Sequence, residues 1–519
     1  MARINSNIPS LFAQSKLTRT QQELQLRLER LSSGLRINRG ADDPAGLIIS
    51  ERLRSDIKGV DQGIKNSDRA SSVISTTEAA LVEVNDLLTS VKSLIVESAN
   101  TGANSRAERD ANQLQIDSAI DSITRISNTS SFGGLKLLNG GLDYRLSGLR
   151  TSAVSRAQVW NASFVDTQNL QVDVDVIASA QKGALYYNGN TVPPGVTLSS
   201  TTLQITGSRG VEVITIPSGR PLTSVVQAVN NLTSLTGVEA SLINNDVNSG
   251  IVFRSTSYGS TSFVSVKRLG GPGLPSQDYF QTYKFANNAP VQSDAPFGWA
   301  SLISAGTLAT GERDEGQDVQ ALVNGNLATG DGLNVKVNSS SLGMDMLLNE
   351  DFATRPSSTN SNFYITGGGA LFQLGQEVNA LQQANLGIPS VAASNLGGVL
   401  INGSLQFLSS IKSGQGNSIA DSVTRGDFSS ASDILDRAID EISILRGRLG
   451  AFERNVLQTN SRSLQSAFEN LSSSVSQIRD ADFAAETSAL TRAQILSSSG
   501  TSVLALANQQ SQQVLQLLG

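Results

Sequence analysis

The 519-residue chain contains neither cysteine nor histidine, and these two absences remove much of the usual chemistry of active sites. Without cysteine there is no disulfide framework and no thiolate nucleophile, and without both residue types there is no Cys/His metal site. Imidazole acid–base catalysis is excluded as well. A carboxylate pair of the glycosidase type stays open, but no motif points to one. We therefore expect a protein that is not an enzyme and holds no cofactor.

Aromatic residues, long apolar runs and a surplus of one charge are also scarce. Aromatics make up 5% and hydrophobic residues 39% of the chain, which is lean for large compact cores and favours burial along thin helical bundles or between chains. A net charge of −6 offers no basic field for nucleic acid. The sequence contains no stretch of about 18 apolar residues, so it predicts no helix that spans a membrane. The first 22 residues lack the apolar core of a secretory signal, so export would need another route.

Both ends of the chain carry the periodicity of long amphipathic helices. We expect helices over residues 4–33, 44–99 and 105–128 in the first block, and from about 428 and over 482–517 in the last. At about 1.5 Å per residue the second would extend on the order of 80 Å, which favours an elongated assembly. Apolar residues recur at the heptad spacing of coiled coils in the first and last helices. These positions are Leu17, Leu24, Leu31, Phe483, Leu490 and Leu504, with Val514 and Leu517 widening the last face.

Local signals mark two helix boundaries near the first block. Gly34 follows the first periodic stretch and is typical of the residue just beyond a helix C-terminus. Asp43 followed by Pro44 is typical of an N-cap and first helical residue, because the carboxylate accepts from free amides and proline has no amide to lose.

Between about residues 145 and 410 the period changes from helical to strand-like. Leu170, Val172, Val174 and Val176 alternate with polar residues, as in a strand with one wet face. Two β-rich units are expected, over about 201–267 and 275–375. The predicted fold is therefore α + β and multidomain: a long antiparallel or coiled-coil helical bundle from the paired N- and C-terminal segments, with β-rich outer domains inserted in the middle.

Three long motifs in the end blocks resemble bacterial flagellin. They are LSSGLRINRGADDPAGLIISERLRS at 31–55, ISNTSSFGGLKLLNG at 126–140, and SQIRDADFAAETSALTRAQIL with GTSVLALANQQSQQVLQLLG at 476–496 and 500–519. Residues 201–267 further resemble a small insert module of flagellins and hook-associated proteins. The resemblance implies a subunit that self-assembles into the flagellar filament used for swimming. A hook–filament junction protein, which shares the terminal helices, is the alternative.

The resemblance also implies a layered subunit that leaves the cell by the flagellar type III export path and ends in the extracellular filament. Its partners would be further copies of itself, an export chaperone, and the cap and hook-associated proteins. The layers implied are 1–43 with 480–519 as a coiled-coil domain lining the channel, 44–175 with 410–479 as a helical rod domain in the tube wall, 176–272 as an outer β-rich insert, and 273–409 as a second β-rich surface domain.

Charged residues in the 34–56 motif allow two interpretations. By charge alone they form a solvated helix face. The resemblance instead favours contacts between subunits, and it implies interface roles for Arg36, Asn38, Asp42 and Asp43 alongside the heptad residues named above.

Animal hosts detect many flagellins through a toll-like receptor that reads the second and third helices. The family arginine important for that contact falls on Ser90, and a family glutamate falls on Gln115, whereas Leu94 keeps the family residue. Neither serine nor glutamine can form the ion pair. The resemblance therefore implies weak activation of the receptor.

Overall fold

The computed structural model divides the chain into two compact units. Unit 1 comprises Met1–Ser71, Gln373–Gln383 and Phe452–Gly519, and unit 2 comprises Ser72–Phe372 and Ala384–Ala451. The described residues are 7–164, 169–189, 194–269, 280–286, 297–339, 341–355, 360–401 and 403–518, and the side chains of 511–518 are outside the description.

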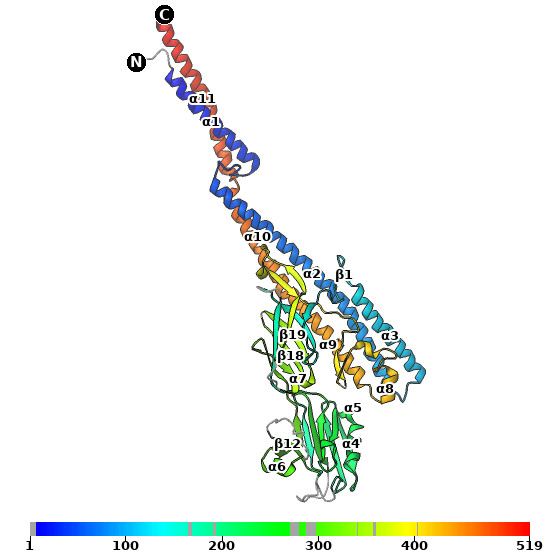
Figure 1. The fold of residues 1–519 in the computed structure, drawn as a ribbon. Coiled ribbons are helices and arrows are strands. Elements are labelled where there is room, and N and C mark those ends of the chain that lie inside the picture. The colour runs from blue at the N-terminus through cyan, green and yellow to red at the C-terminus, as the bar shows by residue number, and fades with distance from the viewer. Residues whose placement is uncertain are drawn as a thin grey trace. The chain divides into compact units, whose positions relative to one another are not determined.

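In unit 1 the first and last helices lie side by side and run antiparallel (Figure 1). Helix α1 (Ile8–Ser33) begins where the Asn7 side chain accepts a hydrogen bond from the Ser10 amide at 3.1 Å, and it ends at Gly34. Gly34 has φ = 71°, a left-handed conformation that a residue without Cβ adopts at little cost. Helix α11 (Phe483–Leu518) is its partner. The predicted helices over 4–33 and 482–517 are confirmed over their described residues; Ile4, part of the pattern, lies outside them.

Helix α2 (Pro44–Ala99) matches the predicted 44–99. The Gly46 amide donates to Asp43 Oδ1 at 2.9 Å, so the Asp43–Pro44 boundary signal is confirmed. In unit 1, α2 lies beside α10 (Gln458–Arg479), and a π-helical turn, Glu453–Leu457, precedes α10. Polar side chains join these two helices: Asn460 donates to Ser67 Oγ, and Ser71 donates to Glu453.

The helices of unit 2 form one bundle from both ends of the chain. The later part of α2 packs with α3 (Arg106–Thr129), α8 (Ile419–Arg425) and α9 (Ser429–Phe452). Ser105 and Glu108 form a capping box that starts α3. Apolar side chains of α2, α3 and α9 form the buried interior of this bundle. The buried residues include Ile74, Leu81, Leu88, Ile95, Ile116, Ile120, Ile123, Leu435, Ile442 and Leu449.

The first β core, also in unit 2, joins two antiparallel sheets through one hydrophobic cluster. Val172, Val174 and Val176 point into it, which confirms the predicted strand with one face toward solvent. In the described chain the sheet orders are β16-β15-β5-β20-β3 and β17-β18-β19-β4. The strands are β3 (Tyr144–Ser147), β4 (Val154–Ala162), β5 (Leu170–Ala178), β15 (Gln320–Val323), β16 (Asn326–Leu327), β17 (Thr329–Asp331), β18 (Asn334–Asn338), β19 (Leu342–Leu348) and β20 (Ser361–Gly368).

The second β core lies within the chain between β5 and β15. Its described sheets have the orders β13-β12-β6-β10-β9 and β14-β11-β7-β8, and α4 (Leu222–Asn230) packs on them. The strands are β6 (Ala184–Tyr187), β7 (Thr201–Gly207), β8 (Val211–Ile216), β9 (Val238–Leu242), β10 (Ile251–Ser255), β11 (Phe263–Leu269), β12 (Thr282–Phe285), β13 (Leu308–Thr310) and β14 (Arg313–Glu315). Small elements are α5 (Thr233–Thr236), α6 (Trp299–Ser304), α7 (Glu350–Thr354), β1 (Ser131–Phe132), β2 (Leu135–Lys136), β21 (Ala370–Gln373), β22 (Gln383–Leu386), β23 (Val399–Ile401) and β24 (Ser404–Gln406).

The two β cores do not follow the boundaries expected at 175 and 272. Strands β3 to β5, expected within the helical wall segment 44–175, belong to the first β core. Strands β12 to β14, expected in the surface domain 273–409, belong to the second. The cause is long-range pairing: β5 takes its neighbours β15 and β20 from more than a hundred residues downstream. Such pairing leaves no local mark in the sequence.

We expect Leu88→Ala to lower the free energy of unfolding of unit 2 by about 2–5 kcal/mol, because Leu88 is fully buried and truncation leaves a cavity. Val96→Ala on the same helix is the matched control, since Val96 is 63% exposed. Chemical denaturation followed by circular dichroism measures both. Equal effects of the two substitutions would contradict the burial of Leu88 inside the bundle.

Candidate assembly surface

The α1–α11 pair of unit 1 brings the predicted heptad residues together. Leu17, Leu24 and Leu31 on α1 and Leu490 and Leu504 on α11 are all half-buried. The seam is held at one end by Asn7, whose Nδ2 donates to the Ala507 carbonyl at 3.1 Å, and by Ser10, whose hydroxyl donates to Asn508 Oδ1 at 2.7 Å. Their half-burial is consistent with a seam between the two helices, and Leu17 Cδ1 lies 3.2 Å from where a Cβ on Gly500 of α11 would stand.

A buried carboxylate holds the other end of the seam. Glu486 on α11 accepts from Arg27 Nη1 at 2.9 Å and from Arg30 Nη1 at 3.2 Å, and its side chain is 9% exposed. Glu23, one turn before Arg27, adds an exposed ion pair at 3.4 Å. Burial alone raises the pKa of Glu486, but the hydrogen bonds from Arg27 and Arg30 outweigh it, so the pKa lies below its ordinary value. The carboxylate thus stays charged and paired at neutral pH.

The loop that joins α1 to α2 is shaped by its own polar side chains. Asp42 Oδ2 accepts from the amides of Asn38 at 3.0 Å and Arg39 at 2.9 Å, and these bonds hold its pKa below the ordinary range. Asp43 caps α2, as described above. Arg36 Nη2 donates to the Ile478 carbonyl at 2.6 Å, and its amide donates to the Arg479 carbonyl. The predicted charged residues of the 34–56 motif are therefore engaged within the chain.

Beside the seam, the same helix pair exposes a set of large apolar side chains, which we call the outer stripe. Their exposed fractions run from 49% to 67%. Of the predicted heptad residues, only Phe483 belongs to this stripe; the side chains of Val514 and Leu517 lie outside the described residues. The heptad count alone misses most of the stripe, because its members fall at several different heptad positions and no single row in the sequence marks them. Its members are Ile8, Leu11, Phe12, Leu28, Phe483, Ile495, Leu496, Val503 and Leu506.

The positions matched to the receptor contact lie on two helices of unit 2. Ser90 on α2 and Gln115 on α3 are exposed, and Leu94 on α2 is half-buried. Two large apolar neighbours, Val96 and Leu114, are also exposed. Both polar side chains are thus open to contact, although neither carries a charge.

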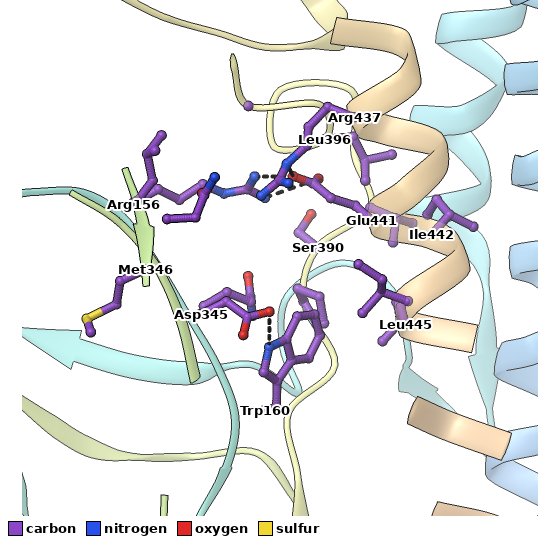
Figure 2. A pocket seen from close by; sticks show the side chains of 17 residues that line it. Arg156, Trp160, Asp345, Met346, Ser390, Leu396, Arg437, Glu441, Ile442 and Leu445 are labelled. Carbon is purple, nitrogen blue, oxygen red and sulfur yellow. Dashed lines mark hydrogen bonds and ion pairs between the residues drawn. The ribbon is translucent and has the colours of Figure 1, made fainter. Parts of the chain in front are cut away.

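One pocket of unit 2 has the charged lining that a catalytic site would need. It lies between the strands β4 and β19 and helix α9, and Figure 2 shows the side chains that line it. Glu441 accepts from Arg156, from Arg437 (3.4 Å) and from the Gly397 amide (3.1 Å). The cavity volume is about 70 Å³, room for one or two waters.

The second carboxylate of this pocket is also paired. Asp345 Oδ2 accepts from Trp160 Nε1 at 2.9 Å, and Arg448 lies 3.4 Å from the same oxygen and 4.3 Å from the Trp160 ring centroid. Both acids thus have cationic partners, and the pocket fastens the first β core to α9. Within the described residues no group of three or more acids could hold a metal, and no helix is long and apolar enough to cross a membrane.

We expect Glu486→Gln to weaken the α1–α11 seam by about 1–3 kcal/mol, because a charged acceptor of two guanidinium bonds is lost. Acid should act likewise. The folded pKa of Glu486 is depressed, so its stabilisation is present above the unfolded value of about 4.3 and is lost as the pH falls through the folded pKa.

Spin labels at Ser15→Cys and Ser498→Cys measure this effect in a chain that has no other thiol. The distance distribution should broaden in Glu486→Gln and at low pH. Glu23→Gln, which removes only the exposed partner, should leave the distribution narrow. An unchanged distribution in Glu486→Gln would show that the buried carboxylate does not hold the seam.

Three family models match the chain and together cover more than half of it. They are the bacterial flagellin N-terminal helical region at residues 4–142, the bacterial flagellin C-terminal helical region at 432–518, and the flagellin hook IN motif at 202–257. The two helical models coincide with the segments that build the α1–α11 pair and the bundle.

Relatives of known name agree with these models. Flagellin of Salmonella muenchen is 27% identical over 99% of both chains, and B-type flagellin of Pseudomonas aeruginosa is 28% identical over 99% of both. Flagellin of Bacillus subtilis is 36% identical over 36% of this chain and 61% of its own. Among solved structures, FliD (HAP2) of Pseudomonas aeruginosa PAO1 matches with a TM-score of 0.27 and 19% identity, covering 40% of this chain and 83% of that one.

The alternative, a hook–filament junction protein, is rejected, because the relatives that align end to end are flagellins. Their named function is consistent with a structural protein, with paired helical ends and with an exported, extracellular product. The chain therefore belongs to the bacterial flagellin family and is a structural subunit of the flagellar filament.

Proposed function

We propose that the subunit is layered, with residues 1–43 and 480–519 lining the channel of the filament and the helices of 44–175 and 410–479 forming its wall. The β cores, from 176–272 and 273–409 together with β3 to β5, form the outer surface. The observation that carries this proposal is the outer stripe: the α1–α11 pair half-buries the heptad leucines and leaves nine other large apolar side chains 49% to 67% exposed.

The outer stripe supplies a driving force for polymerisation. Burying a large apolar side chain stabilises by roughly 1.5–3 kcal/mol when it starts fully exposed, and stripe members start about half exposed. Several such residues act together, so assembly is cooperative. The thin seam alone is a marginal helical pair. In this proposal the ends gain most of their order when neighbouring copies cover the stripe.

The predicted interface residues then have different tasks. Leu17, Leu24, Leu31, Leu490 and Leu504 hold the helix pair together, and Phe483 contacts other copies. The polar residues Arg36, Asn38, Asp42 and Asp43 set the shape of the α1–α2 loop and present that shape to neighbours. The interface roles implied for Val514 and Leu517 stay a prediction, because their side chains lie outside the described residues.

The same apolar ends suit the remaining partners. An export chaperone would shield α11 before assembly, and the cap and hook-associated proteins would contact the same ends at either limit of the filament. These partners follow from family membership and from the exposed Ile495, Val503 and Leu506. We assign no catalytic activity to the β cores.

We expect Ile495→Ser to abolish or strongly slow seeded polymerisation while the circular dichroism of the free subunit stays unchanged, because Ile495 is already 61% exposed in the free subunit. Ile177→Ser, the same change at an exposed position on β5, should leave polymerisation intact. Electron microscopy after seeding measures both. Deletion of 480–519 should likewise leave a folded, soluble but non-polymerising subunit; long filaments from that truncation would contradict the layered arrangement.

We expect the wild-type subunit to activate the toll-like receptor weakly in a reporter-cell assay. Ser90→Arg combined with Gln115→Glu should raise activation at least tenfold, because both exposed positions regain the charges of the family contact. Ser90→Ala with Gln115→Ala is the neutral control. A strong wild-type response at low concentration would refute the weak-activation hypothesis.

A further inference from the structure

A segment of the middle of the chain, Gln373–Gln383, belongs to unit 1 and rests on its helices. It approaches α2 where that helix carries two glycines: a Cβ on Gly59 would lie 2.9 Å from Gln376 Cβ, and one on Gly63 would lie 2.9 Å from the Leu374 carbonyl oxygen. Any larger residue at either position would push the segment away. The close approach is therefore built into the sequence of α2.

Hydrogen bonds from both helices fasten the start of this segment. Asn66 on α2 donates to the Gln373 carbonyl at 3.0 Å, and Asn460 on α10 donates to the Leu374 carbonyl at 2.9 Å. Two helices distant in sequence thus hold two adjacent residues, one each, so the segment has a defined position on unit 1.

Three polar side chains of the segment form hydrogen bonds with its own backbone. Gln373 Nε2 donates to the Glu377 carbonyl at 2.6 Å, and Gln382 Oε1 accepts from the Glu377 amide at 2.7 Å. Asn379 Oδ1 accepts from the Gln382 amide at 3.0 Å. These bonds, together with the buried Leu374, give the segment a fixed shape.

Two apolar side chains of the same segment point outward, whereas a third, Leu374, is buried. Val378 and Leu381 are each 87% exposed, more than any other large hydrophobic residue of the described chain. A subunit on its own gains little apolar burial from these two side chains.

We propose that Val378 and Leu381 form a knob that docks on a second copy of this chain in the filament. The proposal rests on the filament function of the chain. A second copy is the fitting occupant because the knob is fastened to the helices of the unit that carries the outer stripe, and its single charged residue, Glu377, already accepts from Asn379 Nδ2 at 3.1 Å.

The receiving surface is a different part of the same unit. Ile48 and Ile49, at the start of α2, are 62% and 50% exposed and offer an adjacent pair of aliphatic side chains. A contact between two different surfaces of identical subunits is heterologous, and such contacts propagate into open helical polymers instead of closing into dimers. The knob and its receiving pair therefore suit a filament.

Single cysteines at Val378 and Leu381 test this docking, because the chain has no thiol of its own. Each variant is mixed at one part in twenty with wild-type subunit and seeded, and its labelling rate with a thiol reagent is compared between free subunit and filament. We expect labelling in the filament to be at least tenfold slower. Leu327→Cys, on β16 of the first β core and also highly exposed, should label equally fast in both.

Equal labelling of Val378→Cys and Leu381→Cys in subunit and filament would overturn the proposal. Exclusion of these variants from wild-type filaments that still incorporate Leu327→Cys would support it, since it shows that the knob must fit. Failure of the seeded wild-type protein to form filaments, checked by electron microscopy, would instead contradict the filament function. When the wild-type carrier is replaced by a carrier subunit with Ile48→Ser and Ile49→Ser, labelling of Leu381→Cys should become fast again if those residues receive the knob.

Discussion

The antiparallel seam between α1 and α11 is the contact on which unit 1 depends. It joins residues more than 450 positions apart, with leucines along its length and the Glu486 carboxylate, bound by Arg27 and Arg30, near one end. The seam only half-buries its leucines, and the other large apolar side chains of the pair stay 49% to 67% exposed. A marginal helix pair with an uncovered stripe is well suited to a subunit that is exported singly and ordered by its neighbours.

The two ends of the chain pair with each other, so the middle of the chain is an insertion between two helical segments. That insertion is built mainly from β-sheets. In unit 2 the first β core is tied to α9 by the charge pairs of Arg156 with Glu441 and Arg448 with Asp345. Both pairs are only partly buried, and such pairs set orientation more than they add stability. The second β core is in turn inserted between strands of the first, which is how a filament protein extends its surface without altering its helices.

The division of apolar residues between shelter and exposure explains how one sequence encodes both a folded subunit and a polymer. Leu88 and Ile120 are buried inside the bundle of unit 2, whereas Phe12 and Ile495 of unit 1 stay exposed. Both sets belong to helical repeats of similar composition. The difference lies in how many partner helices each repeat meets, which is set by the fold of the whole chain.

The sequence by itself determined the helices and their ends, because helical periodicity, the Asp43–Pro44 cap and the Gly34 stop act within a few residues. It also carried the motifs of the family. Only the tertiary structure decided which leucines face their own chain, that β5 pairs with β15 and β20, and that Gln373–Gln383 rests on Gly59 and Gly63. Those outcomes depend on contacts between residues far apart in the chain, and local propensity carries no information about which distant partner a face will meet.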